Sequence, residues 1–503
     1  MSKKKKIIVI GSGFSGLSAA TSLAQKGYEV CILEKNSTVG GRARSFSSKG
    51  FTFDMGPSWY WMPDVFENYF QKFGKKVSDY YELKRLAPSY RVCFAKDDII
   101  DLPARMSQLI DLFESIEKGS GEKLKQFLKE SKYKYEVGMN DLVFKPGLSL
   151  TEFIDKRVIT GALQLHLLKS MRKYIRSFFK NPKLRKLMEF PVLFLGGTPE
   201  NTPALYSLMN YADISLGTWY PMGGMHKIIE GMVKLAKEMG VQIICDAEVK
   251  KINVKNGRTF SASTKDKEYF FDAIVAGADY HHVEQKLIDP EFRRYDKNYW
   301  DKRDMAPSSL LFYLGINKKI EGIKHHSLFF DEDFDGHAHD LYTKPKWPEK
   351  PLFYVCAPSV TDPSVAPEGM ENLFLLMPTA PGLEDNDEQR ERYYHLLLDR
   401  LEKFTGQKIK EHVVYKRSYA LTDFVEDYNA FKGNAYGLAN TLKQTAILKP
   451  SMKSKKLPNL YFTGQLTVPG PGVPPSLISG QIVADLVQKE IKLAKPNLYE
   501  NTI

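Results

Sequence analysis

Three glycines near the N-terminus have the spacing of a phosphate-binding turn. Gly11, Gly13 and Gly16 follow the apolar run 7–10, which we interpret as a buried parallel strand. In this pattern the first glycine permits the tight turn, the second lets the backbone approach a pyrophosphate, and the third lets the next helix pack closely on its strand. The glycines therefore predict a dinucleotide site, although glycine-rich turns also serve purely structural ends.

The elements that would hold this turn lie on either side of it. Apolar residues at helical spacing predict a helix from about Ser15 to Lys26, which Gly27 would end in the left-handed conformation. A second strand over 30–33 ends at Glu34, where a carboxylate can accept a hydrogen bond from a ribose hydroxyl. The positive end of the helix would face the phosphates.

A second glycine motif, Gly40-Gly41-Arg42, lies just past Glu34. A Gly-Gly-Arg at this distance is typical of flavin enzymes with a strand–helix–strand unit rather than of nicotinamide dehydrogenases. We therefore predict FAD as the cofactor.

The composition bounds the class of protein. With 503 residues, 43% of them hydrophobic, we expect two or more domains with sizeable cores. A net charge of +12 suits an anionic surface, either acidic lipid or nucleic acid, or else a solvated basic exterior. The four cysteines lie far apart without a C-x-x-C pair, which indicates reduced thiols in the cytoplasm. Export is not expected, because strand and helix already account for the apolar start, and no run of about 18 apolar residues predicts a membrane span.

Two segments follow whose interpretation stays open. Residues 45–57 are interpreted as a hairpin with its turn at Gly50. Gly56 and Pro57 then either bring backbone close to the cofactor or form an ordinary turn. The aromatic run 59–62 could belong to a core or line an apolar tunnel.

A basic, apolar region lies in the middle of the chain. Several helices are expected between 63 and 144, including 105–117 and 122–135, as part of a second domain. Residues 160–195 then combine apolar side chains with many cations. This combination fits contact with an anionic membrane, where each cation adds about 1 kcal/mol, and equally fits a solvated basic face. Nucleic-acid binding is not expected, because no recognised module accompanies the charge. The cations counted are Lys169, Arg172, Lys173, Arg176, Lys180, Lys183, Arg185 and Lys186.

The run 325–340, HHSLFFDEDFDGHAHD, has the residue types of a metal site but not the pattern. Its acids match the first half of a calcium loop, yet Tyr342 stands where a bidentate glutamate is needed. We therefore expect a solvated acidic loop and no metal site. His281-His282 has no partner pattern, and no hydrolase motif is present.

The far end of the chain returns to the cofactor. Residues 460–463 predict a last buried strand, followed by a rigid Gly/Pro turn over 464–475 and a helix over 476–491. The N-terminus of this helix would direct its positive end at the flavin ring and stabilise the anionic reduced form. A purely structural turn is the alternative.

With these residues in place, the chain resembles the bacterial-type phytoene desaturases, carotenoid-modifying enzymes of the amine-oxidase-like FAD superfamily. Many members carry a histidine in the T-H-P-G part of the last motif, where this chain has Val468, so no role of that histidine transfers. The motifs shared with the wider superfamily are GSGFSGLSAA at 11–20, Glu34, GGRA at 40–43 and FDMGPS at 53–58. Those more particular to the desaturases are WYPMGGM at 219–225, His325-His326 and the segment 459–480.

The resemblance implies hydride loss from a saturated carbon of phytoene or a related linear polyene to flavin N5, with a proton leaving the adjacent carbon. Such a hydrocarbon comes from a bilayer, which implies an apolar tunnel and peripheral attachment to the membrane from the cytoplasm. Quinone or oxygen is the expected terminal electron acceptor. No residue stands out as the catalytic base.

Other functions share the fold. Within the family, a ketolase or an isomerase remains open. A flavin amine oxidase would handle a polar amine, which the basic apolar helices disfavour. Prenylated-GTPase dissociation inhibitors are non-enzymatic modules of the same architecture, but the Glu34 and Gly-Gly-Arg set favours retained FAD.

The predicted fold class is α/β, with a Rossmann-type FAD-binding domain assembled from separated segments, an α+β substrate domain and a helical membrane-contact region. We expect the FAD-binding domain over 1–75, 220–285 and 445–503, the substrate domain over 76–159 and 286–444, and the basic membrane-contact region over 160–219. The predicted cofactor-binding residues are Gly11, Gly13, Phe14, Ser15, Gly16, Glu34, Lys35, Gly40, Gly41, Arg42, Gly56, Pro57, Val249, Asp279, Gly464, Gln465, Gly472 and Val473.

Overall fold

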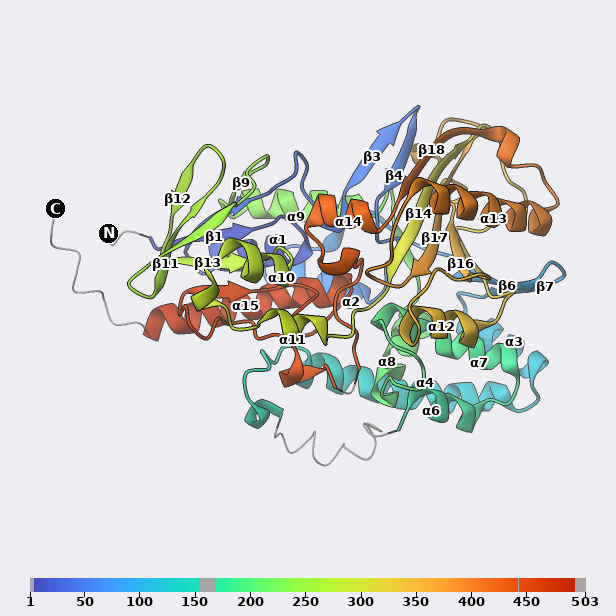
Figure 1. The fold of residues 1–503 in the computed structure, drawn as a ribbon. Coiled ribbons are helices and arrows are strands. Elements are labelled where there is room, and N and C mark those ends of the chain that lie inside the picture. The colour runs from blue at the N-terminus through green and yellow to red at the C-terminus, as the bar shows by residue number, and fades with distance from the viewer. Residues whose placement is uncertain (1–3, 154–168, 442, 494–503) are drawn as a thin grey trace.

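A five-stranded parallel sheet gathers strands from both ends and the middle of the chain (Figure 1). The computed structural model describes residues 4–153, 169–441 and 443–493. Ile7 to Ile10 are buried in the centre of this sheet, as an unbroken apolar run requires of a strand covered on both faces. The strands, in spatial order, are β19 (Leu460–Phe462), β13 (Ala273–Ala276), β1 (Lys6–Ile10), β2 (Glu29–Leu33) and β9 (Gln242–Ile244).

The first and last long helices pack directly on each other beside this sheet. They are α1 (Phe14–Gln25) and α15 (Val473–Leu493), and α9 (His226–Glu238) also packs on α1. Gly480 permits the contact, because a Cβ there would lie 2.4 Å from the Ser15 carbonyl oxygen. The last helix begins three residues before the predicted start at 476. Its two prolines occupy the first turn, where a helix needs no N–H.

A small antiparallel sheet belongs to the same half of the molecule as the parallel sheet. It consists of β10 (Lys251–Lys255), β11 (Arg258–Ser263) and β12 (Glu268–Phe270), with a turn at Asn256 and Gly257 between the first two. The structure begins β10 at Lys251, and Val249 lies in the loop before it.

A seven-stranded mixed sheet forms the other half of the molecule. Its order is β18 (Val413–Tyr419), β14 (Ser308–Ile316), β17 (Glu371–Thr379), β16 (Phe353–Cys356), β15 (His326–Phe329), β6 (Tyr90–Ala95) and β7 (Asp98–Leu102). The helical prediction for 63–144 missed β6 and β7, as well as β5 (Leu83–Arg85), which pairs with β8 (Trp219–Pro221). These strands are short, and although β6 and β7 pair with each other, β6 also pairs with the distant β15 and β5 with the distant β8.

Strand β14 is buried on both faces, and its alternation divides two environments. Leu310 and Phe312 pack with the apolar side of α13 (Asp387–Thr405), whereas Leu311 and Tyr313 belong to the main core on the opposite face. The sheet therefore presents a second apolar face that α13 does not cover.

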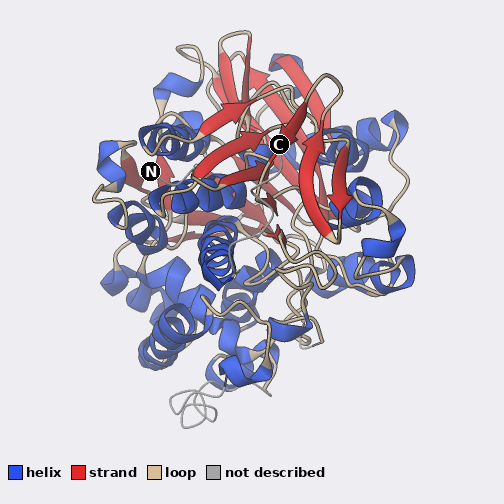
Figure 2. Ribbon diagram, turned by 90° about the vertical axis from the view of Figure 1, so that its left-hand side faces the viewer, coloured by secondary structure: helices blue, strands red, loops and turns tan. Residues whose placement is uncertain are grey.

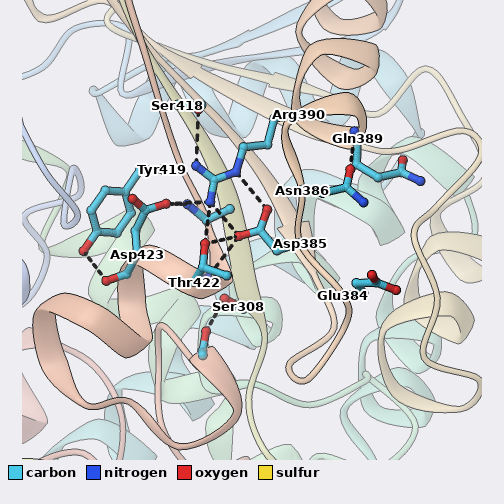
Figure 3. A network of polar contacts seen from close by, with 12 residues as sticks. Ser308, Glu384, Asp385, Asn386, Gln389, Arg390, Ser418, Tyr419, Thr422 and Asp423 are labelled. Atoms are coloured by element: carbon cyan, nitrogen blue, oxygen red, sulfur yellow. Dashed lines mark hydrogen bonds and ion pairs between the residues drawn. The ribbon is translucent and has the colours of Figure 1, made fainter.

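A polar network fixes α13 to α14 (Leu421–Tyr428) (Figure 3). The Arg390 guanidinium donates bidentately to Asp385 at 2.8 and 2.6 Å and also to Asp423 at 2.7 Å. Burial opposes ionisation of Asp385, but its hydrogen bonds to Arg390 and Thr422 outweigh burial and lower the pKa of Asp385. The network thereby holds α14 at the junction of the two halves.

A helical layer lies below the seven-stranded sheet in Figure 1, and Figure 2 shows strands gathered above and helices below. The layer consists of α3 (Met106–Ile116), α4 (Ser120–Val137), α6 (Met171–Phe178), α7 (Pro182–Glu189) and α8 (Leu208–Asn210). The remaining named elements are the hairpin β3 (Ser45–Ser48) and β4 (Phe51–Asp54), and the helices α2 (Pro63–Gln71), α10 (Tyr280–His282), α11 (Lys297–Asp301) and α12 (Phe334–Tyr342). Within the described ranges, no helix has the length and apolar character needed to cross a bilayer.

Candidate active site

One cavity runs from the glycine turn of the parallel sheet to the uncovered face of the seven-stranded sheet. Every predicted cofactor-binding residue lines it except Gly16. Residues from both ends of the chain and from its middle therefore meet at one site. Which of them contact the cofactor stays a prediction.

The glycine turn has the geometry that its spacing predicts. Gly11 has a φ of +91°, which favours glycine. A Cβ on Gly13 would meet no atom within 4 Å, so this position faces open space. A Cβ on Gly16 would lie 2.0 Å from the Gly11 carbonyl oxygen, so Gly16 serves the packing of α1 on its turn. Gly13 therefore faces the cavity, whereas Gly16 permits the close packing of α1 behind it.

Glu34 is buried at the end of β2 and accepts four hydrogen bonds. Its Oε2 accepts from the Ser12 amide at 2.8 Å and the Ser12 hydroxyl at 2.6 Å, and its Oε1 accepts twice from Asn36. These bonds use the lone-pair sites of the carboxylate. A ribose hydroxyl would therefore replace one of the side-chain donors, and Ser12 and Asn36 are neighbours that the sequence interpretation missed.

The second glycine motif packs against the first. Gly40 and Gly41 both have positive φ, and a Cβ on Gly41 would lie 3.3 Å from the Gly13 Cα. Arg42 lies partly buried next to them, and desolvation lowers the pKa of Arg42, partly offset by the nearby Asp279 carboxylate. Its Nη2 donates to the Asn434 carbonyl at 3.2 Å, while its Nε has no hydrogen-bond partner among the described residues. A cation with a buried, unused donor fits an anionic or electron-rich ligand.

The remaining predicted residues complete the cofactor side. A Cβ on Gly56 would lie 2.5 Å from the Arg42 carbonyl oxygen, so the 56–57 turn lies against the Gly-Gly-Arg motif as well as lining the cavity. Asp279 follows β13 and accepts from the backbone amides of His282 and Phe431. Burial raises the pKa of Asp279. Lys35 donates to the Glu426 carbonyl on α14.

The C-terminal motif closes over the same cavity. Gly464 has a φ of +106°, and a Cβ there would lie 3.1 Å from the Ser15 hydroxyl at the start of α1. Gly472 and Val473 line the cavity at the N-terminus of α15. Two helix N-termini, of α1 and α15, thus meet at this site and offer positive potential to an anionic ligand. Together with the open space at Gly13 and the unused donor of Arg42, this arrangement fits FAD.

The other end of the cavity is apolar. The aromatic run 59–62 contributes to both of the predicted environments, a cavity wall and the core. Trp59, Trp61 and Met62 line the cavity, whereas Tyr60 is buried and its hydroxyl contacts that of Tyr81. Across from them lie side chains of the seven-stranded sheet, of α12 and of the residues next to these elements. These are Ser309, Leu311, Leu328, Phe330, Phe334, His337, Ala338, Leu341, Tyr342, Leu352, Phe353, Tyr354, Leu376 and Pro378.

The predicted acidic loop over 325–340 is wrong, because β15 and α12 together occupy most of it. Asp333 caps this helix by accepting from the amides of Asp335 and Gly336. Asp331 pairs with Arg400 and Asp335 with Arg172. A signal was present: positions 334, 337, 338 and 341 carry Phe, His, Ala and Leu at i, i+3, i+4 and i+7.

The structure describes only part of the basic segment 160–195. Its leucines at 163, 165, 167 and 168 lie outside the described residues. Met171 and Ile175 on α6 and Leu184 on α7 are buried in the main core. Arg172 lies within 4 Å of the carboxylates of Glu189, Glu200 and Asp335. The apolar sides of the two described helices therefore face the protein, and membrane contact by this segment stays a prediction.

The fold and the cavity define a flavin-dependent oxidoreductase. The sequence matches the family described as flavin containing amine oxidoreductase over residues 14–488. It is 43% identical to a carotenoid 3,4-desaturase of Haloarcula japonica, over 96% of this chain and 98% of that protein. It is 34% identical to a 4,4'-diapophytoene desaturase (4,4'-diaponeurosporene-forming) of Staphylococcus aureus, over 97% and 99%.

An oxidoreductase from Methanosarcina mazei has a similar solved structure, with a TM-score of 0.63, 17% identity, and coverage of 95% of this chain and 100% of that one. At this identity the likeness shows the fold alone. The chain belongs to the flavin containing amine oxidoreductase family, and within it to the group that contains the carotenoid desaturases. Its cofactor is FAD, which confirms the prediction from the glycine motifs.

Proposed function

We propose that this protein is an FAD-dependent carotenoid desaturase that introduces carbon–carbon double bonds into phytoene or a related linear carotenoid. The observation that carries the proposal is the single cavity in which a glycine-lined cofactor side continues into a long apolar side. The full-length similarity to two enzymes named as carotenoid desaturases supports the choice of substrate class. Bound FAD would supply hydride acceptance at N5, while a proton leaves the adjacent carbon.

The charge distribution in the cavity favours a hydrocarbon over an amine. Its carboxylates, Glu34, Glu248, Asp279 and Asp427, come from β2, the loop before β10, the end of β13 and α14, all on the cofactor side. The described lining residues from the seven-stranded sheet and α12 carry no acid or permanent cation. An alkylammonium ion would lose its hydration there without a partner, whereas an uncharged polyene gains from burial.

The polar groups on the apolar side are largely held by other protein groups. The His337 Nδ1 accepts from the Leu352 amide at 2.9 Å, and its Nε2 lies 3.2 Å from the Pro378 carbonyl oxygen. Burial lowers the pKa of His337 to about 4, so this imidazole is neutral near pH 7. A neutral ring occupied at both nitrogens is a poor proton acceptor. The chain's contribution on this side is then to orient the polyene and exclude water.

Pigment analysis tests the proposed reaction. A host that accumulates phytoene, and a second that accumulates a 30-carbon analogue, would each express the full chain. We expect new carotenoids with longer conjugation in at least one host, and none from a Gly13→Ala variant whose Cβ enters the cofactor side. Unchanged pigment in both hosts, with FAD-loaded protein present, would contradict the proposal. Carotenoid products that contain oxygen and no additional double bonds between carbons would instead indicate a ketolase.

A lipid surface is the proposed source of this substrate. Phe144, Leu148 and Leu448 are 42%, 44% and 48% exposed. Gly147, between the first two, lies against Ala446 and Val468, so the segment that carries Phe144 and Leu148 adjoins the one that carries Leu448. We define these three side chains as the apolar tip. Lys173 and Lys180 on the basic segment are exposed and could add attraction to anionic lipid.

Vesicle binding tests the apolar tip. Replacing Phe144 and Leu148 by serine should weaken binding to phosphatidylglycerol vesicles at least tenfold, or about 1.4 kcal/mol. Phe270→Ser is the matched control, because Phe270 is 62% exposed on β12 in the small sheet of the cofactor side. Equal vesicle binding by all variants would contradict peripheral attachment through this surface. The domain boundaries given above and a quinone or oxygen acceptor are part of the same proposal.

A further inference from the structure

Three side chains with metal-binding atoms meet behind the apolar side of the cavity. His326 on β15 and Cys356 on β16 are cross-strand partners, and His325 directly precedes β15. Directly opposite residues of an antiparallel pair project to the same face of the sheet. One nitrogen of each imidazole and the Cys356 sulfur lie within 4.8 Å of one another, and all three residues are buried.

Hydroxyl groups fix both rings. The His326 Nδ1 lies 2.6 Å from the Tyr354 hydroxyl, and the His325 Nδ1 lies 2.8 Å from the Thr361 hydroxyl. The Nε2 atoms of both rings are buried and have no hydrogen-bond partner among the described residues. An imidazole held at one nitrogen and open at the other has the arrangement of a metal ligand with its outer partner. Two unpartnered buried nitrogens in one cluster otherwise leave their desolvation uncompensated.

The environment suits ligands of this kind. His325, His326 and Cys356 are 6%, 0% and 4% exposed, so the cluster is closed off from solvent. Imidazole nitrogen and thiolate sulfur are the ligand atoms that zinc prefers in proteins. The Asp54 carboxylate lies on the same small cavity as Cys356.

This small cavity adjoins Cys356 but neither histidine, so it offers room for one further ligand beside the sulfur. It has a volume of about 20 Å³ and is lined by Cys356, Ser58 and Asp54, among others. This is enough for one water molecule. Two imidazoles, one thiolate and a water make the four-coordinate set that zinc prefers, whereas calcium and magnesium prefer oxygen ligands.

We propose that His325, His326 and Cys356 form a zinc site with Tyr354 and Thr361 as its outer partners. The site goes beyond the proposed desaturation and transfers no electrons. The Trp59 ring stacks on His326 with centroids 4.1 Å apart, and Trp59 lines the apolar side of the cavity. A metal that fixes His326 would thereby fix this part of the wall. The sequence alone predicts no metal here, because Cys356 lies far from the histidines in sequence and only the pairing of β15 with β16 brings it opposite His326.

Zinc binding by the full FAD-loaded chain tests the site. After chelator treatment and removal of the chelator, wild-type protein should take up one Zn²⁺ per chain, measured by elemental analysis and by competition with a zinc-binding dye. Cys356→Ser should weaken zinc binding at least tenfold. Cys93→Ser is the matched control, because Cys93 is another buried cysteine of the same sheet and lies outside the cluster. Tyr354→Phe keeps the three ligands and should weaken binding about 10- to 100-fold.

The thermal midpoint gives a second readout that needs no variant. Zn²⁺ should raise the midpoint of chelator-treated wild-type protein, because a ligand of the folded state stabilises it. No uptake by wild-type protein at micromolar Zn²⁺, or equal uptake by wild-type and Cys356→Ser proteins, would overturn the proposal. A buried water in place of zinc would give the first of these results. Either result leaves the desaturation assay unaffected, so the two proposals fail separately.

Discussion

The two sides of the cavity recognise their ligands by different means. On the cofactor side, Gly11, Gly13, Gly41 and Gly464 bring backbone and helix N-termini to the cavity surface. On the apolar side, aromatic and aliphatic side chains from the seven-stranded sheet and α12 make up the wall. Backbone recognition tolerates few residue types at each position, whereas a hydrocarbon is held by apolar area that many side chains can supply. The two sides should therefore respond differently to small substitutions.

The largest effect is expected for Gly16→Ala. The new Cβ would lie 2.0 Å from the Gly11 carbonyl oxygen and 3.0 Å from its carbon, so the turn or α1 must shift. We expect a loss of about 3 kcal/mol or more in the free energy of unfolding, measured by denaturant titration. Near-wild-type stability would mean that α1 does not pack on the turn as described.

Gly13→Ala should separate binding from folding. A Cβ at this position meets nothing within 4 Å, so the apoprotein should unfold at nearly the wild-type denaturant midpoint. FAD affinity should fall at least tenfold, because the methyl group occupies space on the cofactor side. Flavin fluorescence titration measures this affinity. Undiminished binding would show that the dinucleotide does not approach Gly13.

Phe334→Ala should give the opposite pattern on the apolar side. Phe334 lines the cavity from α12 and packs edge-on against Phe330, with ring centroids 5.6 Å apart. Its loss removes apolar contact with a polyene but leaves the glycine turn unchanged. We expect unchanged FAD content and a fall of about tenfold in kcat/KM for the carotenoid, which corresponds to about 1.4 kcal/mol. A parallel loss of FAD would contradict the separation of the two sides.

A dependence of stability on pH reaches both sides. Burial lowers the pKa of His282 on the cofactor side and of His337 on the apolar side to about 4, from an ordinary value of 6.5. The unfolded chain then binds more protons between pH 6.5 and 4. Their contribution to stability is complete above pH 6.5 and is lost as the pH falls through this range, by up to about 1.4 kcal/mol per pH unit for the buried His337.

Thermal midpoints between pH 7 and pH 5 test this dependence. The wild-type midpoint should fall with the pH, and less steeply in His337→Gln, whose amide can replace the bonds to Leu352 and Pro378. Equal slopes for the two proteins would mean that His337 is not buried in the neutral form.

The cofactor side could be predicted from sequence because its constraints are local. Gly11, Gly13 and Gly16 lie within one turn, and each glycine answers a steric demand that no other residue meets as well. The unit from β1 to Glu34 follows the same logic. Ser12 and Asn36 escaped prediction because hydrogen-bonding side chains around a carboxylate are interchangeable in a single sequence.

The apolar side could not be assembled in the same way. Its wall joins Trp59 to Leu311, Phe334 and Tyr354 through strand pairings between segments hundreds of residues apart in some cases, as in the pairing of β6 with β15. The periodic signal of α12 was present but was obscured by acids that the structure pairs with arginines. The apolar residues of α6 at helical spacing did not show whether its apolar face meets a membrane or the protein. In the structure, Met171 and Ile175 of this face are buried in the main core.

A single-turnover experiment tests the central claim most directly. FAD-loaded protein would be mixed without oxygen with a linear carotenoid in phospholipid vesicles while the visible spectra of flavin and polyene are followed together. We predict that the absorbance of oxidised flavin decreases as a carotenoid with longer conjugation forms in equal amount. Flavin that stays oxidised with carotenoids but is reduced by a simple alkylamine would contradict the claim and identify an amine oxidase.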